Sequence, residues 1–146
     1  MKIYFAGSIR GGREDARIYE AMITWLGSFG EVLTEHVGNA DLSEAGADGP
    51  SDRYIHDRDM AWLMACDLVV AEVSVPSLGV GYELGWATAL SKPILCPHRT
   101  VSPRPLSAMI AGSPGIRRAV YASLDEAETI MRKFINEIAE HKGSVS

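Results

Sequence analysis

The amino-acid sequence predicts a single α/β domain, built on a parallel sheet of five strands with helices on both faces. Short apolar runs rich in Val, Ile and Leu alternate along the chain with longer stretches of helical periodicity. This alternation is typical of a parallel sheet whose crossover helices cover both faces. The length of 146 residues is that of one domain. We expect the flavodoxin-like or Rossmann-like strand order 2-1-3-4-5, with the domain over residues 1–140 and a frayed tail over 141–146.

The first predicted elements are a strand, a glycine-rich turn and a helix. Lys2–Ala6 is apolar enough for a buried strand, and the glycines of Gly7–Gly12 end it. The helix Arg13–Phe29 places its apolar residues on one face, namely Ile18, Ala21, Met22, Trp25 and Phe29. Gly30 should end this helix as a C-cap, and a second strand is expected at Glu31–Glu35.

A long polar stretch, Val37–Arg53, separates the second strand from the second helix. Connections beyond about 12–15 residues are often lids in compact domains, and plain disorder is the equal alternative. The helix follows at Tyr54–Ala65, with Ser51 or Asp52 as its N-cap.

The second half of the chain continues the alternation. Asp67–Val73 is a Val-rich third strand, and a loop with one Pro and two Gly leads to a third helix at Tyr82–Ser91. A fourth strand is expected at Pro93–Cys96. The remaining elements are a short helix, a fifth strand and a final amphipathic helix, at Leu106–Ala111, Ala119–Tyr121 and Leu124–Glu140.

The composition limits the partners and the compartment. A net charge of −5 argues against a nucleic-acid polymer as partner, although a mononucleotide needs only a local anion site. No run approaches the roughly 18 apolar residues of a membrane span, and the N-terminus lacks a signal-peptide core. Cys66 and Cys96 are expected as reduced core thiols, and no Cys/His spacing matches a zinc site. The cytosol is therefore the expected location, with the nucleus as the alternative.

The predicted strand order brings two glycine-rich loops together. In that order the first and third strands are neighbours, and ligands bind beyond their carboxyl ends. The loops that leave these strands are Gly7–Gly12 and Ser74–Gly81. We therefore expect the ligand between these two loops.

The first of these loops has the features of an anion site. Its glycines allow backbone N–H groups to turn toward an anion, and the following helix adds positive potential. Ser8 supplies a hydroxyl, Arg10 a bidentate fork, and Ser77 of the second loop a further hydroxyl. The loop matches neither a Walker motif nor the dinucleotide fingerprint. A simple tight turn is the alternative for the loop, and a helix cap is the alternative for Ser77.

Two carboxylates fall within apolar helical stripes. Glu83 shares the stripe of the third helix, with Val80, Leu84, Ala87 and Leu90. Asp59 shares the stripe of the second helix, with Ile55, Trp62, Leu63 and Cys66. A carboxylate there must be paired or functional, because an unpaired buried charge is costly. Both lie near the predicted loop edge, where paired carboxylates serve glycosidic cleavage; two separate structural carboxylates are the alternative.

Two further residues complete the candidates. Tyr4 on the first strand could reach Glu83 across the switch point, or be an ordinary core aromatic. His36 near the end of the second strand is a possible contact to a base or sugar, or a structural histidine. No G-x-S-x-G elbow supports a hydrolase triad.

Long motifs of the chain resemble the 2′-deoxynucleoside 5′-monophosphate N-glycosidases of the nucleoside 2-deoxyribosyltransferase family. The resemblance covers nearly the whole chain and is carried by Tyr4–Asp15, Val32–Val37, Ile55–Asp59, Val70–Val73, Pro76–Gly85 and Leu106–Ile110. The long loop and the last helix are least similar. The resemblance implies cleavage of the bond between base and deoxyribose, which yields free base and 2-deoxyribose 5-phosphate.

The resemblance also implies roles for individual residues. Glu83 would be the nucleophile at C1′, Tyr4 would orient it, and Asp59 would hold the sugar hydroxyl or assist departure of the base. The residues of the 5′-phosphate pocket would be Gly7, Ser8, Ile9, Arg10, Gly11, Ser77, Gly79 and Gly81. Ser107 would reach the phosphate from the other subunit of a homodimer, and no metal or redox cofactor is implied.

Two rival functions stay open at this point. A deoxyribosyltransferase would use the same glycosyl-enzyme but pass the sugar to a second base. A nucleotide-binding module without catalysis would need the phosphate loops but not the carboxylates. The base preference is not indicated by the sequence.

Overall fold

The computed structural model describes residues 1–9, 15–34, 50–102 and 104–144. Its five-stranded sheet has the order β2-β1-β3-β4-β5, and every adjacent pair of strands is parallel. This is the predicted fold and strand order. The strands are β1 Lys2–Ala6, β2 Glu31–Val32, β3 Leu68–Ala71, β4 Ile94–Arg99 and β5 Arg117–Tyr121. The helices are α1 Ala16–Gly27, α2 Asp52–Ala65, α3 Leu78–Ala89, α4 Ala108–Ala111 and α5 Leu124–Gly143.

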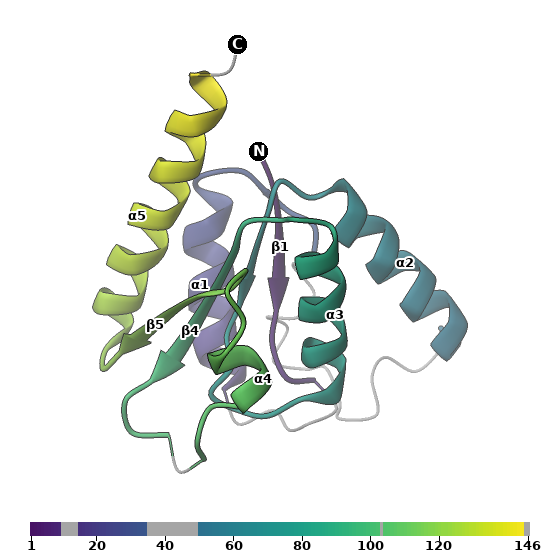
Figure 1. Cartoon of the computed structure of the whole chain (residues 1–146), viewed down its shortest axis with the longest axis horizontal. Helices are drawn as coiled ribbons and strands as arrows, with labels where there is room; N and C mark the ends of the chain where they lie inside the picture. The colour runs from purple at the N-terminus through teal and green to yellow at the C-terminus, as the bar shows by residue number, and fades with distance from the viewer. Residues whose placement is uncertain (10–14, 35–49, 103, 145–146) are drawn as a thin grey trace.

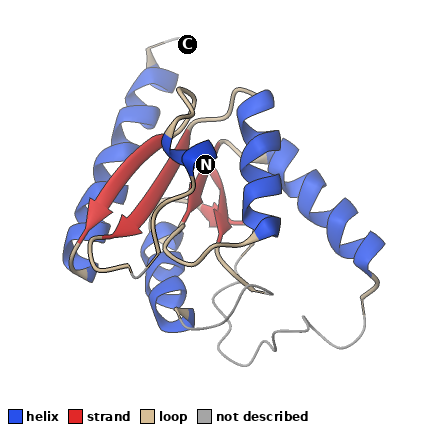
Figure 2. Cartoon of the chain, turned by 60° about the horizontal axis from the view of Figure 1, so that its bottom comes forward, coloured by secondary structure: helices blue, strands red, loops and turns tan. Residues whose placement is uncertain are grey.

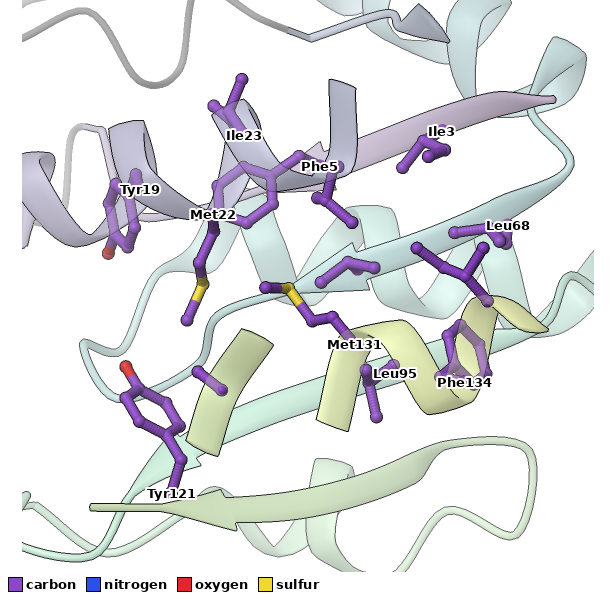
Figure 3. Close-up of a cluster of buried hydrophobic side chains, with 14 residues drawn as sticks. Ile3, Phe5, Tyr19, Met22, Ile23, Leu68, Leu95, Tyr121, Met131 and Phe134 are labelled. Atoms are coloured by element: carbon purple, nitrogen blue, oxygen red, sulfur yellow. The ribbon is translucent and has the colours of Figure 1, made fainter. Parts of the chain in front are cut away.

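Helices cover both faces of the sheet (Figures 1 and 2). Side chains alternate across the sheet along β1, so Ile3 and Phe5 pack with α1 and α5, whereas Tyr4 and Ala6 pack with α2 and α3. Figure 3 shows the first of these two cores, in which Met22 of α1 and Met131 of α5 meet the strands. The switch point therefore lies beyond the carboxyl ends of β1 and β3, as expected.

The third helix begins earlier than the sequence pattern predicts. The expected start was Tyr82, but α3 begins at Leu78, and Ser77 caps it by accepting a hydrogen bond from the Val80 N–H at 3.3 Å. Gly79 and Gly81 therefore lie within the first turns of the helix and not in a loop. The cap, worth about 1 kcal/mol, offsets part of the low helix propensity of the two glycines, which costs about 1 kcal/mol per residue.

The expected end of the first helix was wrong. The helix ends at Gly27 with Ser28 as C-cap, so Gly30 does not end it. Gly30 has a different reason to be glycine, because a Cβ there would lie 2.2 Å from the Met1 carbonyl oxygen. The start of the chain thus runs against this turn, where Glu31 N donates to the same carbonyl at 2.9 Å.

The second strand is also shorter than predicted. It stops at Val32, because the side chain of Thr34 replaces the next backbone pair. Thr34 Oγ1 lies 2.8 Å from the Phe5 N–H and 2.6 Å from the Phe5 carbonyl. Glu35 and most of the expected loop Val37–Arg53 lie outside the described residues.

Other boundaries differ by a few residues. Ser51 caps α2, as one of the two expected residues, and accepts a hydrogen bond from the Tyr54 N–H at 3.2 Å. The last helix continues to Gly143, three residues past its expected end at Glu140. Within the described ranges, no helix is long and apolar enough to cross a membrane. Cys66 and Cys96 are buried free thiols.

Candidate active site

The site is built around a contact between β1 and α3. The Tyr4 hydroxyl donates a hydrogen bond of 2.8 Å to Glu83 Oε1. Tyr4 is buried on the α2/α3 side of the sheet, and Glu83 lies in the second turn of α3. The contact confirms the expectation that Tyr4 reaches Glu83 across the switch point. It fixes one carboxylate oxygen, and no hydrogen bond to the other is seen among the described residues.

The environment makes Glu83 harder to ionise than an ordinary glutamate. Burial raises the pKa of Glu83 from 4.5 to about 7, and the negative charge of Asp59 adds to the rise. The hydrogen bond from Tyr4 opposes this rise but does not cancel it. Burial, together with the charges of Glu83 and Asp59, also raises the pKa of Tyr4, so its hydroxyl stays a donor. The proton of Glu83 is therefore held more tightly than that of an ordinary glutamate, and only its ionised form can act as a nucleophile.

Asp59 supplies the second carboxylate from α2. It lies close enough to raise the pKa of both Tyr4 and Glu83, so the two predicted carboxylates share one electrostatic environment. Asp59 pairs with Arg58, whose Nη2 lies 2.9 Å from Oδ1. The Arg58 guanidinium is in turn stacked on the Trp62 ring, at 4.7 Å from its centroid. Asp59 is therefore paired rather than buried alone.

A histidine at the start of α2 joins this helix to α3. His56 is exposed and contacts Tyr82 and Asp57. Its Nε2 lies 3.2 Å from the Tyr82 hydroxyl and its Nδ1 lies 2.9 Å from Asp57 Oδ1. Because Tyr82 precedes Glu83, this contact links the two helices that carry the carboxylates.

The loop after β1 is held from behind by Tyr19 of α1. The Ser8 N–H donates to the Tyr19 hydroxyl at 3.2 Å. A Cβ at Gly7 would lie 2.9 Å from the Tyr19 ring, so only glycine fits there. Ser8 itself is fully buried, and its hydroxyl has no hydrogen-bond partner among the described residues. The sequence pattern gave Tyr19 no role, although it lies on the apolar face of the first helix.

The second predicted phosphate loop is the N-terminus of α3. Ser77 accepts from Val80 N–H but can still donate its own hydroxyl hydrogen. A Cβ at Gly79 would meet Ser77 Oγ at 3.8 Å, and one at Gly81 would meet nothing within 4 Å. Packing among the described residues therefore does not require glycine at these two positions. N–H groups of the first helical turn have no partner within the helix and favour an anion.

The remaining predicted site residues lie apart from this cluster or outside the description. Ile9 is partly buried beside Ser8. Ser107 is exposed at the N-terminus of α4 and makes no side-chain cap, on the connection between β4 and β5. Arg10, Gly11 and His36 lie outside the described residues, so their roles stay predictions.

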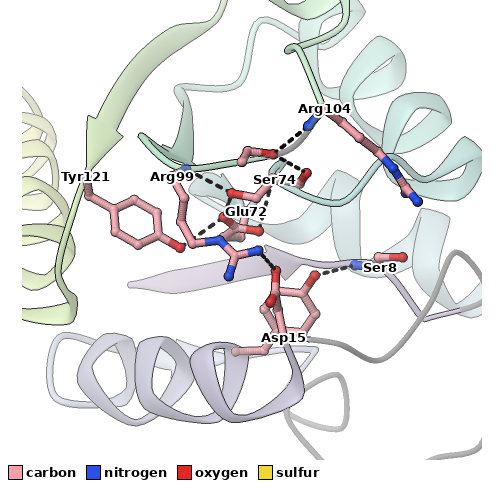
Figure 4. Close-up of polar contacts among 9 residues, drawn as sticks. Ser8, Asp15, Glu72, Ser74, Arg99, Arg104 and Tyr121 are labelled. Carbon is pink, nitrogen blue, oxygen red and sulfur yellow. Dashed lines mark hydrogen bonds and ion pairs between the residues drawn. The ribbon is translucent and has the colours of Figure 1, made fainter.

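A second polar cluster, which the sequence analysis did not identify, lies on the opposite face of the same sheet edge (Figure 4). Glu72 is fully buried and accepts hydrogen bonds from the Ser74 hydroxyl and, at 3.0 Å, from the Tyr121 hydroxyl. Arg99 pairs with Asp15 at 2.7 Å. Burial raises the pKa of Glu72 against the effect of these hydrogen bonds. The sequence carried a sign of this cluster, because Glu72 interrupts an apolar run, much as Glu83 interrupts the apolar stripe of a helix.

The groups around Tyr4 and Glu83 have the features of an active site for a small anionic substrate. A hydrogen-bonded carboxylate, a second carboxylate and two helix N-termini meet at the ligand-binding edge of a parallel sheet. Across the described ranges, no cluster of three or more His, Cys, Asp or Glu could hold a metal ion. The geometry suits nucleophilic attack by Glu83 on a small substrate that carries an anionic group.

Comparison with known proteins identifies the family. The sequence model described as nucleoside 2-deoxyribosyltransferase matches residues 3–109, and the chain belongs to this family. It is 48% identical over 144 residues to a 5-hydroxymethyl-dUMP N-hydrolase of Danio rerio, covering 97% of this chain and 100% of that protein. It is 53% identical over 136 residues to the Mus musculus protein of the same name, and the match covers 90% of this chain and 78% of that protein.

Further comparisons agree in family and fold. A putative 2′-deoxynucleoside 5′-phosphate N-hydrolase 1 of Trichoplax adhaerens is 56% identical over 111 residues, which cover 76% of this chain and 75% of that protein. Among solved structures, a CMP N-glycosidase of Clostridium botulinum matches with a TM-score of 0.67 at 20% identity. That match covers 90% of this chain and 98% of the other, and it supports the fold alone.

Proposed function

We propose that this protein hydrolyses the N-glycosidic bond of 2′-deoxynucleoside 5′-monophosphates to free base and 2-deoxyribose 5-phosphate. The observation that carries this proposal is the Tyr4–Glu83 hydrogen bond of 2.8 Å at the ligand-binding edge. Family membership and the names of the N-hydrolase relatives support the same reaction. Because two of these relatives are named for 5-hydroxymethyl-dUMP, we propose this modified nucleotide as the preferred substrate.

Glu83 acts as the nucleophile in this mechanism. Its carboxylate attacks C1′, the C1′–N bond breaks, and the base leaves with the bonding electron pair and gains a proton. Water then attacks C1′ of the glycosyl ester, which frees the sugar phosphate and restores Glu83. Tyr4 keeps one carboxylate oxygen in place. Asp59 holds the sugar hydroxyl or assists departure of the base, and the missing 2′-hydroxyl eases formation of positive charge at C1′.

The 5′-phosphate is proposed to bind between the β1 loop and the N-terminus of α3. The buried Ser8 hydroxyl, which has no partner among the described residues, is an available donor there. The space beside Gly81, where a Cβ would meet nothing within 4 Å, allows close approach of a ligand. Arg10 and Gly11 are predicted to complete this pocket from the sequence alone.

The test is a panel of deoxynucleotides and their nucleosides, assayed by chromatography of the released base. We expect release from 5-hydroxymethyl-dUMP by the wild type and none by Glu83→Ala, with Glu20→Gln on the exposed side of α1 as charge control. One charge-assisted phosphate contact is worth roughly 1.5–3 kcal/mol, so nucleosides should react at least about tenfold less efficiently.

Three outcomes would contradict the proposal. Near-normal turnover by Glu83→Ala would overturn the nucleophile. Equal kcat/KM for nucleotide and nucleoside would overturn the phosphate pocket. Transfer of the sugar to an added free base in preference to water would favour a deoxyribosyltransferase, in line with the family description.

We also propose a homodimer with shared sites. Large apolar side chains recur every fourth residue along α3 and are exposed in one chain: Leu78, Tyr82, Trp86 and Leu90. Such a ridge is typical of a helix that packs against a partner. Met109 of α4 is 82% exposed and extends the exposed apolar surface. Ile110 instead packs against the chain's own α2/α3 core.

In this dimer Ser107 reaches the phosphate of the partner's site. Its own chain places it after β4, which β3 separates from β1. Mixing a Ser107→Ala chain with a Glu83→Ala chain should restore partial activity, because each heterodimer holds one site with both residues intact. Exchange of subunits without any gain over the more active parent would refute shared sites. The two buried free thiols fit a reducing compartment, so we propose a cytosolic location.

A further inference from the structure

We propose that Arg99 positions the two phosphate loops relative to each other, and so determines how tightly the 5′-phosphate binds. This inference rests on the proposed function and assigns a role to a buried polar cluster that the mechanism does not use. The cluster consists of Asp15, Glu72, Ser74, Arg99 and Tyr121, and Figure 4 shows Arg99 between Ser74 and Asp15.

Arg99 touches one end of each loop. Its backbone N–H donates to Ser74 Oγ at 2.9 Å, and Ser74 begins the loop that leads into α3. Its guanidinium Nη2 donates to Asp15 Oδ2 at 2.7 Å, and Asp15 is the residue on which the β1 loop ends as N-cap of α1. One residue at the end of β4 therefore joins Asp15, where the β1 loop ends, to Ser74, where the second loop begins.

Asp15 pairs with Arg99 and does not stabilise its own helix as a side-chain cap. Asp15 is 4% exposed and sits at the N-cap of α1, yet its side chain makes no cap hydrogen bond to its own helix. A helix end would normally use such a carboxylate for a cap, which stabilises by about 1 kcal/mol. A buried ion pair is itself seldom more stabilising than apolar packing. The cost of burying this pair therefore points to a role in the site.

The rest of the cluster anchors the backbone of Arg99 through Ser74. Ser74 donates its hydroxyl to Glu72, and the Tyr121 hydroxyl at the end of β5 donates to the same Oε1 of Glu72. The ends of β3, β4 and β5 are thus joined on the α1/α5 face. The opposite end of the β1 loop is held by the hydrogen bond from the Ser8 N–H to Tyr19 of α1, the helix that Asp15 precedes as N-cap.

A direct contact between Arg99 and the phosphate is the competing explanation. The Arg99 side chain is 28% exposed, and its Nε has no hydrogen-bond partner within the described ranges. The two explanations differ in their dependence on Asp15. A positioning role acts through the pair, so loss of either partner should have the same effect, whereas a direct contact would survive the loss of Asp15.

The experiment compares Arg99→Gln, Asp15→Asn, the double variant and Arg99→Lys with the wild type. For 5-hydroxymethyl-dUMP we expect each single variant to lose about tenfold in kcat/KM, mainly through KM, and the double variant to lose no more. The corresponding nucleoside should react as with the wild type. Arg99→Lys should recover part of the loss, because an ammonium can still pair with Asp15. Arg117→Gln, which breaks an exposed ion pair with Glu137, is the matched control and should change nothing.

Calorimetric binding of 2-deoxyribose 5-phosphate is measured on the same variants, since it needs no turnover. We expect about tenfold weaker binding by Arg99→Gln and by Asp15→Asn. Binding that depends on Arg99 in a protein that releases no base would refute the proposed function but support this inference. Unchanged phosphate binding in both single variants would overturn the inference, as would a loss on Arg99→Gln that persists in the Asp15→Asn background. Equal losses of kcat/KM for the nucleotide and the nucleoside would show that the cluster has only a structural role, and would overturn the inference. A wild type that binds no 2-deoxyribose 5-phosphate would overturn it as well.

Discussion

Replacing Glu83, the proposed nucleophile, should make the protein more stable at neutral and alkaline pH. Burial and the nearby Asp59 raise the pKa of Glu83 from 4.5 to about 7. At pH values between 4.5 and about 7, the folded chain therefore still holds a proton on Glu83 that the unfolded chain has released. By linkage, the free energy of unfolding falls as the pH rises through this window. Glu83→Gln removes the titration and can still accept the hydrogen bond from Tyr4.

The size of the effect follows from the two pKa values. A difference of one pKa unit corresponds to about 1.4 kcal/mol, so the rise from 4.5 to about 7 in Glu83 costs roughly 3 kcal/mol once both states are ionised. At pH 8 nearly all of this cost is present. At pH 5 less than about 1 kcal/mol remains. We therefore expect Glu83→Gln to exceed the wild type in stability by roughly 3 kcal/mol at pH 8 and by little at pH 5.

Urea unfolding at pH 5 and pH 8, followed by tryptophan fluorescence, measures this difference. Glu20→Gln on α1 and Glu137→Gln on α5 are the controls for the loss of one carboxylate. Arg117 lowers the pKa of Glu137, so that substitution should not stabilise the chain at pH 8. A Glu83→Gln variant that is no more stable than the wild type at pH 8, or equally stabilised at both pH values, would refute the electrostatic reasoning.

Three further predictions concern the same site. Tyr4→Phe removes the hydrogen bond that lowers the pKa of Glu83, so a ¹³C NMR titration should give a higher pKa for Glu83 in this variant than in the wild type. Asp59→Asn removes a charge that raises it, so the same titration should move in the opposite direction; shifts of one sign in both variants would contradict the assignment. Gly7→Ala forces a Cβ to within 2.9 Å of the Tyr19 ring, which should cost about 1–3 kcal/mol in unfolding experiments, and an unchanged stability would show that the loop relaxes freely.

The fold was predictable because burial leaves a periodic record in the sequence. The inner strands β1, β3 and β4 are buried between helices on both faces, so their runs of apolar residues stand out from the polar stretches around them. The same logic located Glu83 and Asp59, since a carboxylate within an apolar stripe calls for a partner. Tyr4 then followed from the strand order, which makes β1 and β3 neighbours.

Features that depend on single contacts were not predictable in this way. The early start of α3 rests on the hydroxyl of Ser77, and the short β2 rests on Thr34, whose side chain replaces a backbone pair with Phe5. The spacing of apolar residues does not show where a single side chain takes the place of a backbone hydrogen bond. The cluster around Arg99 joins residues up to 84 positions apart, from α1 and three strand ends. Only Glu72 gave a local sign of it, as a charge within an apolar run.

In the proposed mechanism Glu83 forms a covalent bond to the sugar while a deoxynucleotide is cleaved. Acid quenching during turnover of 5-hydroxymethyl-dUMP, followed by peptide mass spectrometry, detects this bond. The peptide that contains Glu83 should carry one 2-deoxyribosyl 5-phosphate group in the wild type, and Glu83→Ala should show neither adduct nor release of base. Base release by Glu83→Ala at the wild-type rate, or an adduct on any other residue, would contradict the account.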